Sequence, residues 1–242
     1  MLEEVTGLIF SETPYGETSK IINVFTKEHG LIGVMCKGAK QLKSKNRATT
    51  LRFTYAKFNI YYKKDKLSTF SSADIINPLK NIKSDIILIS YLSYLTELTT
   101  QVIKQSSNNI IYNDFINTVL KMEEGLDPLI LTNILELKFL DFLGVGINLD
   151  SCIECGNKTN IVTISADKGG FLCTNCLTNE KIVNKKVIKL LRLYYYVNIS
   201  SIKKLDIDQD IKQEINTFLD SYYDRYTGLY LNSKDFLKTI IS

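Results

Sequence analysis

The chain has 242 residues, of which 45% are hydrophobic and 23% are charged, with a formal net charge of +4. This composition is typical of globular proteins and excludes extensive disorder, and the length predicts two or three modest folding units. The longest unbroken apolar run, residues 193–197, is far shorter than the roughly 18–20 residues of a membrane span. The first residues, Met-Leu-Glu-Glu, lack the basic and apolar segments of a secretory signal. We therefore expect neither a membrane partner nor secretion.

Histidine occurs once, as His29. No histidine-based metal cluster can be assembled, and a Ser-His-Asp or Cys-His pair could use only this residue, which lies in a Lys-Glu-His-Gly sequence typical of a turn. The chain also lacks the Walker A ending of nucleotide-binding loops and the signature of zinc deaminases. We therefore expect a binding protein with no catalytic residues rather than an enzyme.

Residues 1–78 predict a small β-barrel. Five short runs of β-branched and aromatic residues are separated by turn signals such as Pro-Tyr-Gly and His-Gly. The runs are residues 8–10, 21–25, 31–35, 53–62 and 67–70. Five short strands favour a closed or partly open barrel, and the pattern alone does not separate an SH3-like barrel from an OB fold.

Residues 79–147 and 181–242 predict an all-helical domain. Apolar residues recur at spacings of three and four between Ile82 and Leu98, and again over 111–120 and 211–226. Asp127-Pro128 is a typical helix start, with aspartate as N-cap and proline at the first helical position. The helix that follows, over 129–143, is apolar on nearly every side, which predicts a place in the middle of a bundle.

Residues 148–180 contain four of the five cysteines, spaced as Cys-x2-Cys and Cys-x2-Cys. A predicted strand over 161–165, a turn over 167–170 and a return strand would bring the second pair beside the first. Four thiolates at this spacing suit a tetrahedral Zn²⁺, whereas two disulfides would need an oxidising compartment. Because four sulfurs close the metal shell, we expect structural zinc. The predicted ligands are Cys152, Cys155, Cys173 and Cys176, and the fifth, Cys36, is predicted to be a buried core thiol.

Positive charge is concentrated between Lys37 and Lys66. This segment has ten lysines and arginines and one aspartate, a net charge of +9, so the rest of the chain sums to −5. Such a segment indicates a polyanionic partner, although it could also be a solvated lysine-rich loop. The residues predicted to contact nucleic acid are Lys37, Lys40, Lys43, Lys45, Arg47, Arg52, Tyr55, Lys57, Tyr61 and Lys63.

Alternation along residues 52–63 sharpens this prediction. One face carries Thr54, Ala56, Phe58, Ile60 and Tyr62 and can fill a barrel, while the other interleaves aromatic residues with lysines. The second face suits base stacking beside phosphate contacts, or alternatively packing of its tyrosines against the helical domain. We expect the loop over 37–47 to be mobile until nucleic acid binds.

A second, smaller basic cluster follows the cysteines. Lys185, Lys189 and Arg192 would share one face of a predicted helix. This face could accept an acidic peptide tail, or it could simply be a solvated helix surface.

These features together resemble the RecO family of bacterial recombination mediators. The resemblance rests on Tyr15-Gly-Glu, on Lys27-Glu-His-Gly, on Lys37-Gly-Ala-Lys, and on Leu143-Gly followed by the cysteine pairs with Gly156 and Gly169-Gly170. Order, spacing and length fit along the whole chain. Arg52 and Ile147 stand where the family often has proline, a departure that bears on local loop geometry more than on function.

The resemblance implies an α+β multidomain protein: an OB-fold DNA-binding domain over 1–78, then a helical domain over 79–147 and 181–242 with a zinc-ribbon-like module of four cysteines at 148–180. It implies DNA repair and homologous recombination in the cytoplasm, associated with the nucleoid. The family binds single- and double-stranded DNA, anneals complementary strands and helps to load RecA onto DNA covered by single-strand-binding protein. Its partners are RecR, the acidic tail of that protein and, in some members, RecF.

Two other functions are compatible with the residues alone. An OB fold with a zinc ribbon could bind RNA. Only contacts to the 2′-hydroxyl would let such a protein distinguish RNA from DNA. The basic segment could instead dock an acidic protein, as in a scaffold.

Overall fold

The computed structural model describes residues 2–106 and 108–241. They form two compact units, Met1–Ile89 with Ser107–Ile116, and Ser90–Ser106 with Asn117–Ser242. Each unit is described separately below.

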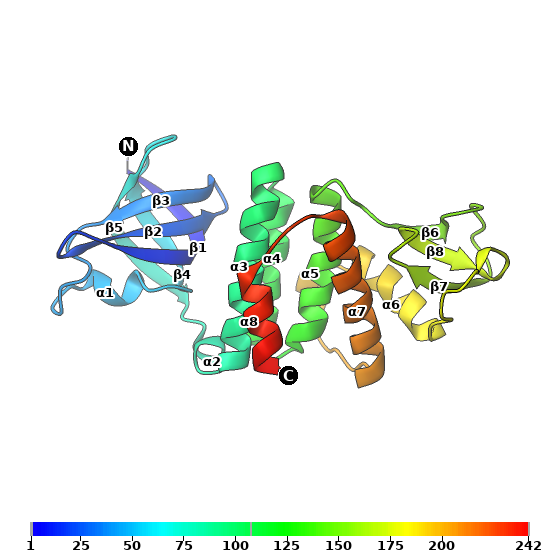
Figure 1. Ribbon diagram of the computed structural model, residues 1–242. Helices are drawn as coiled ribbons and strands as arrows, with labels where there is room; N and C mark the ends of the chain where they lie inside the picture. The colour runs from blue at the N-terminus through cyan, green and yellow to red at the C-terminus, as the bar shows by residue number, and fades with distance from the viewer. Residues whose placement is uncertain (1, 107, 242) are drawn as a thin grey trace. The chain divides into compact units, whose positions relative to one another are not determined.

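The first unit is built on a closed five-stranded barrel (Figure 1). Its strands are β1 (Leu2–Tyr15), β2 (Ser19–Thr26), β3 (Gly30–Cys36), β4 (Tyr55–Tyr61) and β5 (Ser68–Asn77). The order around the barrel is β1-β2-β3-β5-β4, with β3 and β5 parallel and the other pairs antiparallel. This is the arrangement of an OB fold, so the barrel and its five strands are confirmed, although β1 and β5 are much longer than the predicted runs 8–10 and 67–70.

Strand alternation fills the barrel as predicted. Ala56, Phe58 and Ile60 of β4 are buried and pack in one core with residues of the other strands, among them Val5, Ile22, Val34 and the predicted core thiol Cys36. His29 lies in the turn between β2 and β3, where its ring stacks on Tyr62 with centroids 3.8 Å apart.

The first unit also contains short helical segments and the beginning of α4. A one-turn helix, α1 (Asn46–Thr49), interrupts the loop between β3 and β4, and α2 (Lys80–Lys83) follows β5. Tyr112 and Phe115 of α4 (Asn109–Glu123) close the barrel on one side, with the Phe115 ring 5.1 Å from Phe10 and 5.8 Å from Phe25. The Tyr112 hydroxyl donates to the carbonyl of Thr6 at 3.1 Å.

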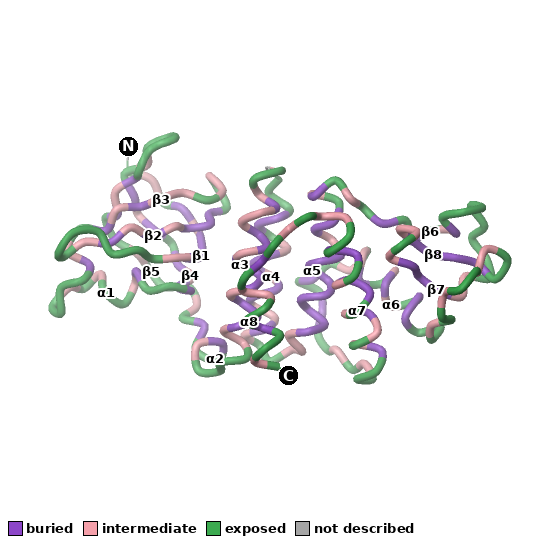
Figure 2. The backbone as a smooth tube through the Cα atoms, viewed as in Figure 1, coloured by how far each residue is buried: buried purple, intermediate pink, exposed green. Residues whose placement is uncertain are grey.

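The second unit is a helical bundle organised around α5 (Pro128–Phe142). Its other helices are α3 (Ile86–Gln105), α6 (Lys185–Tyr196), α7 (Gln209–Tyr226), α8 (Asn232–Ile241) and the short η2 (Ile199–Ser201). Figure 1 shows α7 beside α5, and Figure 2 shows α5 buried along most of its length. Asp127 caps α5 by accepting from the backbone N–H groups of Leu129 and Ile130 at 3.0 and 3.1 Å, as predicted.

One helix, α3, is long and apolar enough to cross a membrane by length and composition alone, and 50% of the relevant window is buried inside the protein. A core helix has the same properties, and this feature is weak support for a membrane span.

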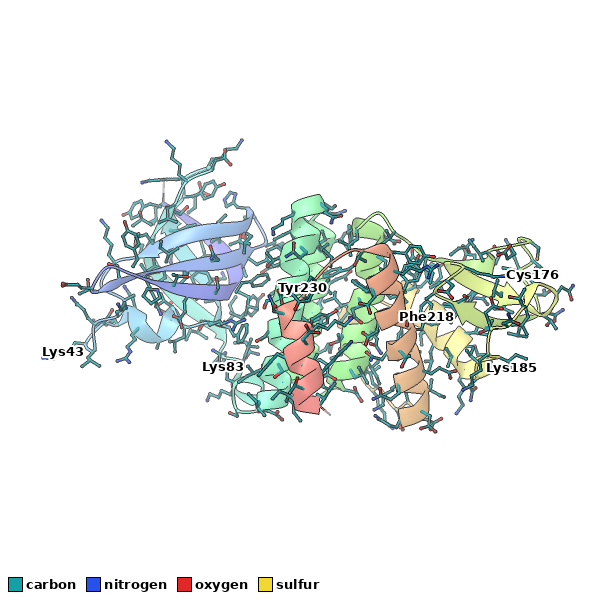
Figure 3. The ribbon with its side chains drawn as sticks, viewed as in Figure 1. Lys43, Lys83, Cys176, Lys185, Phe218 and Tyr230 are labelled. Carbon is teal, nitrogen blue, oxygen red and sulfur yellow. The ribbon has the colours of Figure 1, made fainter. Side chains whose placement is uncertain are left out.

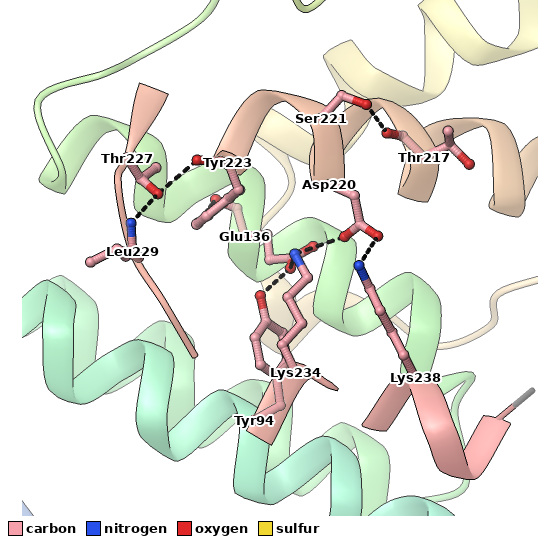
Figure 4. Close-up of polar contacts among 10 residues, drawn as sticks. All are labelled: Tyr94, Glu136, Thr217, Asp220, Ser221, Tyr223, Thr227, Leu229, Lys234 and Lys238. Atoms are coloured by element: carbon pink, nitrogen blue, oxygen red, sulfur yellow. Dashed lines mark hydrogen bonds and ion pairs between the residues drawn. The ribbon is translucent and has the colours of Figure 1, made fainter. Parts of the chain in front are cut away.

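A buried polar cluster holds the C-terminal helix α8 in the bundle (Figure 4). Lys234 of α8 lies 2.7 Å from the Asp220 carboxylate of α7 and 3.7 Å from the Glu136 carboxylate of α5. Tyr94 of α3 donates a hydrogen bond to Glu136. Lys238, one turn further along α8, pairs with Asp220 at 3.1 Å.

A small three-stranded sheet completes the second unit. It consists of β6 (Asn148–Cys152), β7 (Ile161–Ser165) and β8 (Gly170–Cys173) in the order β6-β8-β7, followed by the short helix η1 (Thr174–Cys176). The predicted hairpin is present as β7 and β8, which pair antiparallel from Ile161–Cys173 to Ser165–Gly170.

Candidate metal centre and nucleic-acid interface

The four predicted cysteine ligands converge at one end of the small sheet. The sulfur atoms of Cys152, Cys155, Cys173 and Cys176 all lie within 4.8 Å of one another. Sulfurs in a tetrahedral zinc shell with bonds of about 2.3 Å are separated by about 3.8 Å. The Sγ atoms of Cys155 and Cys173 are 3.7 Å apart, so the donor set fits Zn²⁺.

Local backbone geometry builds this cluster from both cysteine pairs. The first pair sits on a tight turn in which the N–H of Gly156 donates to the carbonyl of Cys152 at 2.8 Å, with Gly156 at φ +74°. The second pair ends β8 and starts η1, so the β7–β8 hairpin carries it to the first. Figure 3 shows Cys176 at this position.

The environment of Cys152 favours the thiolate that a metal requires. Burial raises its pKa, but hydrogen bonds from the backbone of Cys173, Cys155 and Glu154 outweigh burial and lower the pKa to about 6. Cysteine binds metal as the thiolate, so this turn suits a zinc ligand. Four sulfur ligands leave no open position for substrate, which fits a structural metal.

The predicted nucleic-acid residues lie on the barrel unit, divided between two loops and strand β4. The β3–β4 loop (residues 37–54) carries the first six, and Lys63 lies in the β4–β5 loop (residues 62–67). Figure 3 shows Lys43 at the outer end of the β3–β4 loop. The two loops leave the barrel at different places, so the linear charge cluster becomes two basic patches.

Five of the predicted cations have side chains that make no hydrogen bond or ion pair within residues 2–106 and 108–241. They are Lys37, Lys43, Lys45, Arg47 and Lys63, and all are exposed. An exposed cation without an internal partner can neutralise a phosphate without first breaking a contact.

The other three predicted cations have partners within the barrel unit. Lys40 donates to the carbonyl of Gly16 at 3.2 Å, and Lys57 pairs with Glu4 at 3.1 Å. The Arg52 guanidinium donates to the carbonyl of Phe10 at 2.9 Å and lies over the Phe53 ring. Burial lowers the pKa of Arg52, which indicates a side chain partly withdrawn from solvent.

The two predicted stacking tyrosines of β4 have different surroundings. Tyr55 lies near Tyr112 of α4, and next to burial it is the main cause that raises the pKa of Tyr112. Tyr61, at the other end of β4, is 50% exposed. Tyr61 therefore presents the more accessible aromatic face.

Two further cations of the β4–β5 loop, Lys64 and Lys66, add to the basic charge but are absent from the predicted contacts. Both are exposed and, within the described residues, have no ion pair. In OB folds this loop is a recurrent site of oligonucleotide contact. The charge pattern alone does not show which loop these lysines occupy. The barrel topology would have placed them among the predicted contacts.

The helix face of Lys185, Lys189 and Arg192 is only partly open. Lys185 and Lys189 are exposed. The Arg192 guanidinium donates to the carbonyl of Leu149 at 2.8 Å and lies over the Phe171 ring, so it ties α6 to the small sheet.

Comparisons with known proteins match both parts of the chain. Residues 1–79 match the family model described as "Recombination protein O N terminal", and residues 83–235 match "Recombination protein O C terminal". The chain is 35% identical to the DNA repair protein RecO of Bacillus pumilus, over 100% of this chain and 96% of the relative. It is 33% identical to RecO of Halalkalibacterium halodurans with the same coverage, and 33% identical to RecO of Bacillus subtilis over 98% of this chain and 94% of the relative.

Proposed function

The chain belongs to the RecO family of DNA repair proteins, and from this premise we propose that it is a recombination mediator that acts on DNA without catalysing a covalent step. It binds single- and double-stranded DNA, anneals complementary strands and, together with RecR, helps to load RecA onto DNA covered by single-strand-binding protein. In some settings RecF joins these partners. The observation that carries the proposal is the set of exposed cations on the two loops of the OB barrel whose side chains have no partner among the described residues.

Annealing requires a surface that holds any sequence. Lysines and arginines on flexible stems contact phosphates, which are identical at every base step, and an exposed aromatic such as Tyr61 can stack on any base. Such a surface can hold two complementary strands while their bases remain available to pair.

The remaining parts of the proposal follow from the same family membership. Zinc would be bound by Cys152, Cys155, Cys173 and Cys176 and would stabilise the small sheet rather than take part in chemistry. The protein would act in the cytoplasm at the nucleoid.

Lys185 and Lys189 are proposed to contact the acidic tail of single-strand-binding protein. The double variant K185E/K189E should weaken binding of a tail peptide in a titration, while Arg192 is left in place because of its contacts to the small sheet. Unchanged affinity would remove this face from the proposal.

The main test is annealing of complementary strands that have been coated with single-strand-binding protein. The variant K43E/K45E/R47E reverses three exposed cations of the β3–β4 loop that have no partner in the described part of the chain. Its control, K158E/K203E/K204E, makes the same charge change at exposed lysines outside the barrel. We expect lost annealing in the first variant only. Equal activity in both, or a clear preference of the wild type for RNA over DNA, would overturn the proposal.

A further inference from the structure

A groove of about 820 Å³ lies in the second unit between strand β7 and helix α7. We propose that this groove docks an extended, basic segment of a partner protein, which adds a strand to the open edge of β7. The inference is independent of DNA binding by the barrel.

The first wall of the groove is a strand edge. Because β7 is the outer strand in the order β6-β8-β7, it pairs with another strand on one side only, as far as the described residues show. Its outer edge is covered at the beginning, where the N–H of Val183 donates to the carbonyl of Val162 at 3.1 Å and the Thr163 hydroxyl donates to the carbonyl of Lys181 at 2.6 Å. The groove is lined by residues 163–167, of which Ile164 and Ser165 are the part of β7 beyond these contacts, while residues 166–167 begin the turn to β8. A strand edge of this kind is a template for β-augmentation.

The second wall is one face of α7. Its lining residues recur at spacings of three and four along the helix: Asp210, Gln213, Glu214, Thr217, Phe218 and Ser221. Figure 3 shows Phe218 on the side of α7 that faces the small sheet. Phe218, Val187 and Ile164 form the apolar floor of the groove, with at most 9% of each residue exposed. The exposed side chains of α7 would therefore supply most of the contacts to an added strand.

The charge of the groove-lining residues favours a basic segment. It contains four carboxylates and one cation, Lys181. Asp167 is paired with Arg225 at 2.7 Å and Glu180 lies 3.7 Å from Lys168. Asp210 and Glu214 have no side-chain hydrogen bond or ion pair within the described residues. Two uncompensated carboxylates opposite a strand edge favour lysines or arginines that alternate with apolar residues, and they oppose DNA.

The experiment uses the zinc-loaded full chain and three fluorescent hexapeptides. One alternates Lys and Val, and one alternates Glu and Val. The third alternates Lys and Pro, which keeps the charge but has no backbone N–H at every second residue, so it forms a strand ladder poorly. In fluorescence anisotropy at low salt we expect the Lys-Val peptide to bind, the Glu-Val peptide not to bind, and the Lys-Pro peptide to bind roughly tenfold more weakly. Hydrogen exchange should slow at residues 164–166 when the Lys-Val peptide is present.

The variant D210N/E214Q removes the two uncompensated charges with little change in shape. It should lower the affinity for the Lys-Val peptide roughly fivefold. The control D224N/D235N removes two exposed carboxylates outside the groove and should leave the affinity unchanged. Circular dichroism confirms folding of both. Absence of binding, equal loss in both variants, or equal affinity of the Lys-Pro peptide would each overturn the proposal, and the carboxylates would then only protect the edge of β7 from self-pairing.

Discussion

Glu136 is a carboxylate buried in the helical bundle. It lies in the apolar helix α5 with 1% of its surface exposed, and one of its oxygens has no hydrogen-bond partner within the described residues. Burial raises the pKa of Glu136, opposed by Lys234 and by the hydrogen bond from Tyr94. Burial lowers the pKa of Lys234, but Glu136 and Asp220 outweigh it and raise the pKa. Lys234 is therefore the cation on which the buried carboxylate depends.

Removing either partner should have unequal costs. Lys234→Met leaves Glu136 without its cation, and we expect a loss of about 3–5 kcal/mol in the free energy of unfolding. Glu136→Gln leaves the hydrogen bond from Tyr94 and the pair of Lys234 with Asp220, so it should cost less. The double variant should be more stable than the sum of the single losses predicts. Urea unfolding of the wild type, the two single variants and the double variant measures these free energies. Equal losses in the two single variants that sum to the loss in the double variant would contradict the prediction.

Reactivity at single cysteines gives a second test at this scale. Burial raises the pKa of Cys36 in the barrel core to about 12, so its thiol should not react with an aromatic disulfide reagent at pH 8. We expect four reactive thiols after zinc is chelated and a fifth only after denaturation. Reaction of Cys36 in the folded protein would contradict its buried position.

At the scale of elements, local signals in the sequence were sufficient wherever one segment carries its own pattern. The cap at Asp127, the β7–β8 hairpin and the alternation of β4 are confirmed because each depends on neighbouring residues. The full length of β1 was not visible. It pairs with β2 at one end and β4 at the other, with a register shift between Ile9 and Ser11, so its apolar pattern is broken.

The candidate site could also be predicted only where the signal lies within one segment of the sequence. The clustering of the four cysteines could be predicted because their spacing is typical of a metal-binding set. The partners of the basic residues could not, because they come from distant parts of the chain. Arg52, for example, donates to the carbonyl of Phe10, 42 residues away. The helix α1 also lacks a signal, since it has no side-chain cap and no buried residue.

The β6–β8 sheet should depend on metal more than the helices do. The core cluster at its cysteine end is small, with Cys152, Leu172 and Cys173 as buried members, so a bound metal would supply much of the stability there. We expect about one zinc per chain by atomic absorption. Cys173→Ser should lose the zinc and the hydrogen-exchange protection of Leu172, whereas the control Cys36→Ser should keep both. Retained protection without zinc would contradict the structural role.

At the scale of the whole molecule, the buried tyrosines govern stability at high pH. Burial raises the pKa of Tyr91 and of Tyr222 to about 12, and it raises the pKa of Tyr94 and Tyr223 well above the usual value. Above about pH 10 these groups lose protons in the unfolded chain but keep them in the native protein. The native state then binds more protons, so stability falls as pH rises.

This linkage predicts steep alkaline unfolding. Each tyrosine that ionises only in the unfolded chain adds about 1.4 kcal/mol per pH unit to the slope above pH 10. Tyr223→Phe should reduce the slope by that amount, measured by urea unfolding between pH 9 and 12. The control Tyr230→Phe changes a side chain that is 76% exposed and should leave the slope unchanged. An unchanged slope in Tyr223→Phe would contradict the assigned burial effect.

The uneven distribution of charge sets how DNA affinity responds to salt. A barrel segment of +9 on a chain whose remaining residues sum to −5 should attract DNA through released counterions rather than through overall charge. If about five phosphates are neutralised, affinity for single strands should fall by roughly 10²–10³ between 50 and 200 mM salt. K43E/K45E/R47E removes up to three of these contacts, so its plot of log affinity against log salt should be shallower by about 2, while K158E/K203E/K204E should keep the wild-type slope. Anisotropy titrations of one oligonucleotide at four salt concentrations measure all three slopes. A common slope would mean that DNA is bound outside the β3–β4 loop, and an affinity independent of salt would mean that phosphates are not contacted at all.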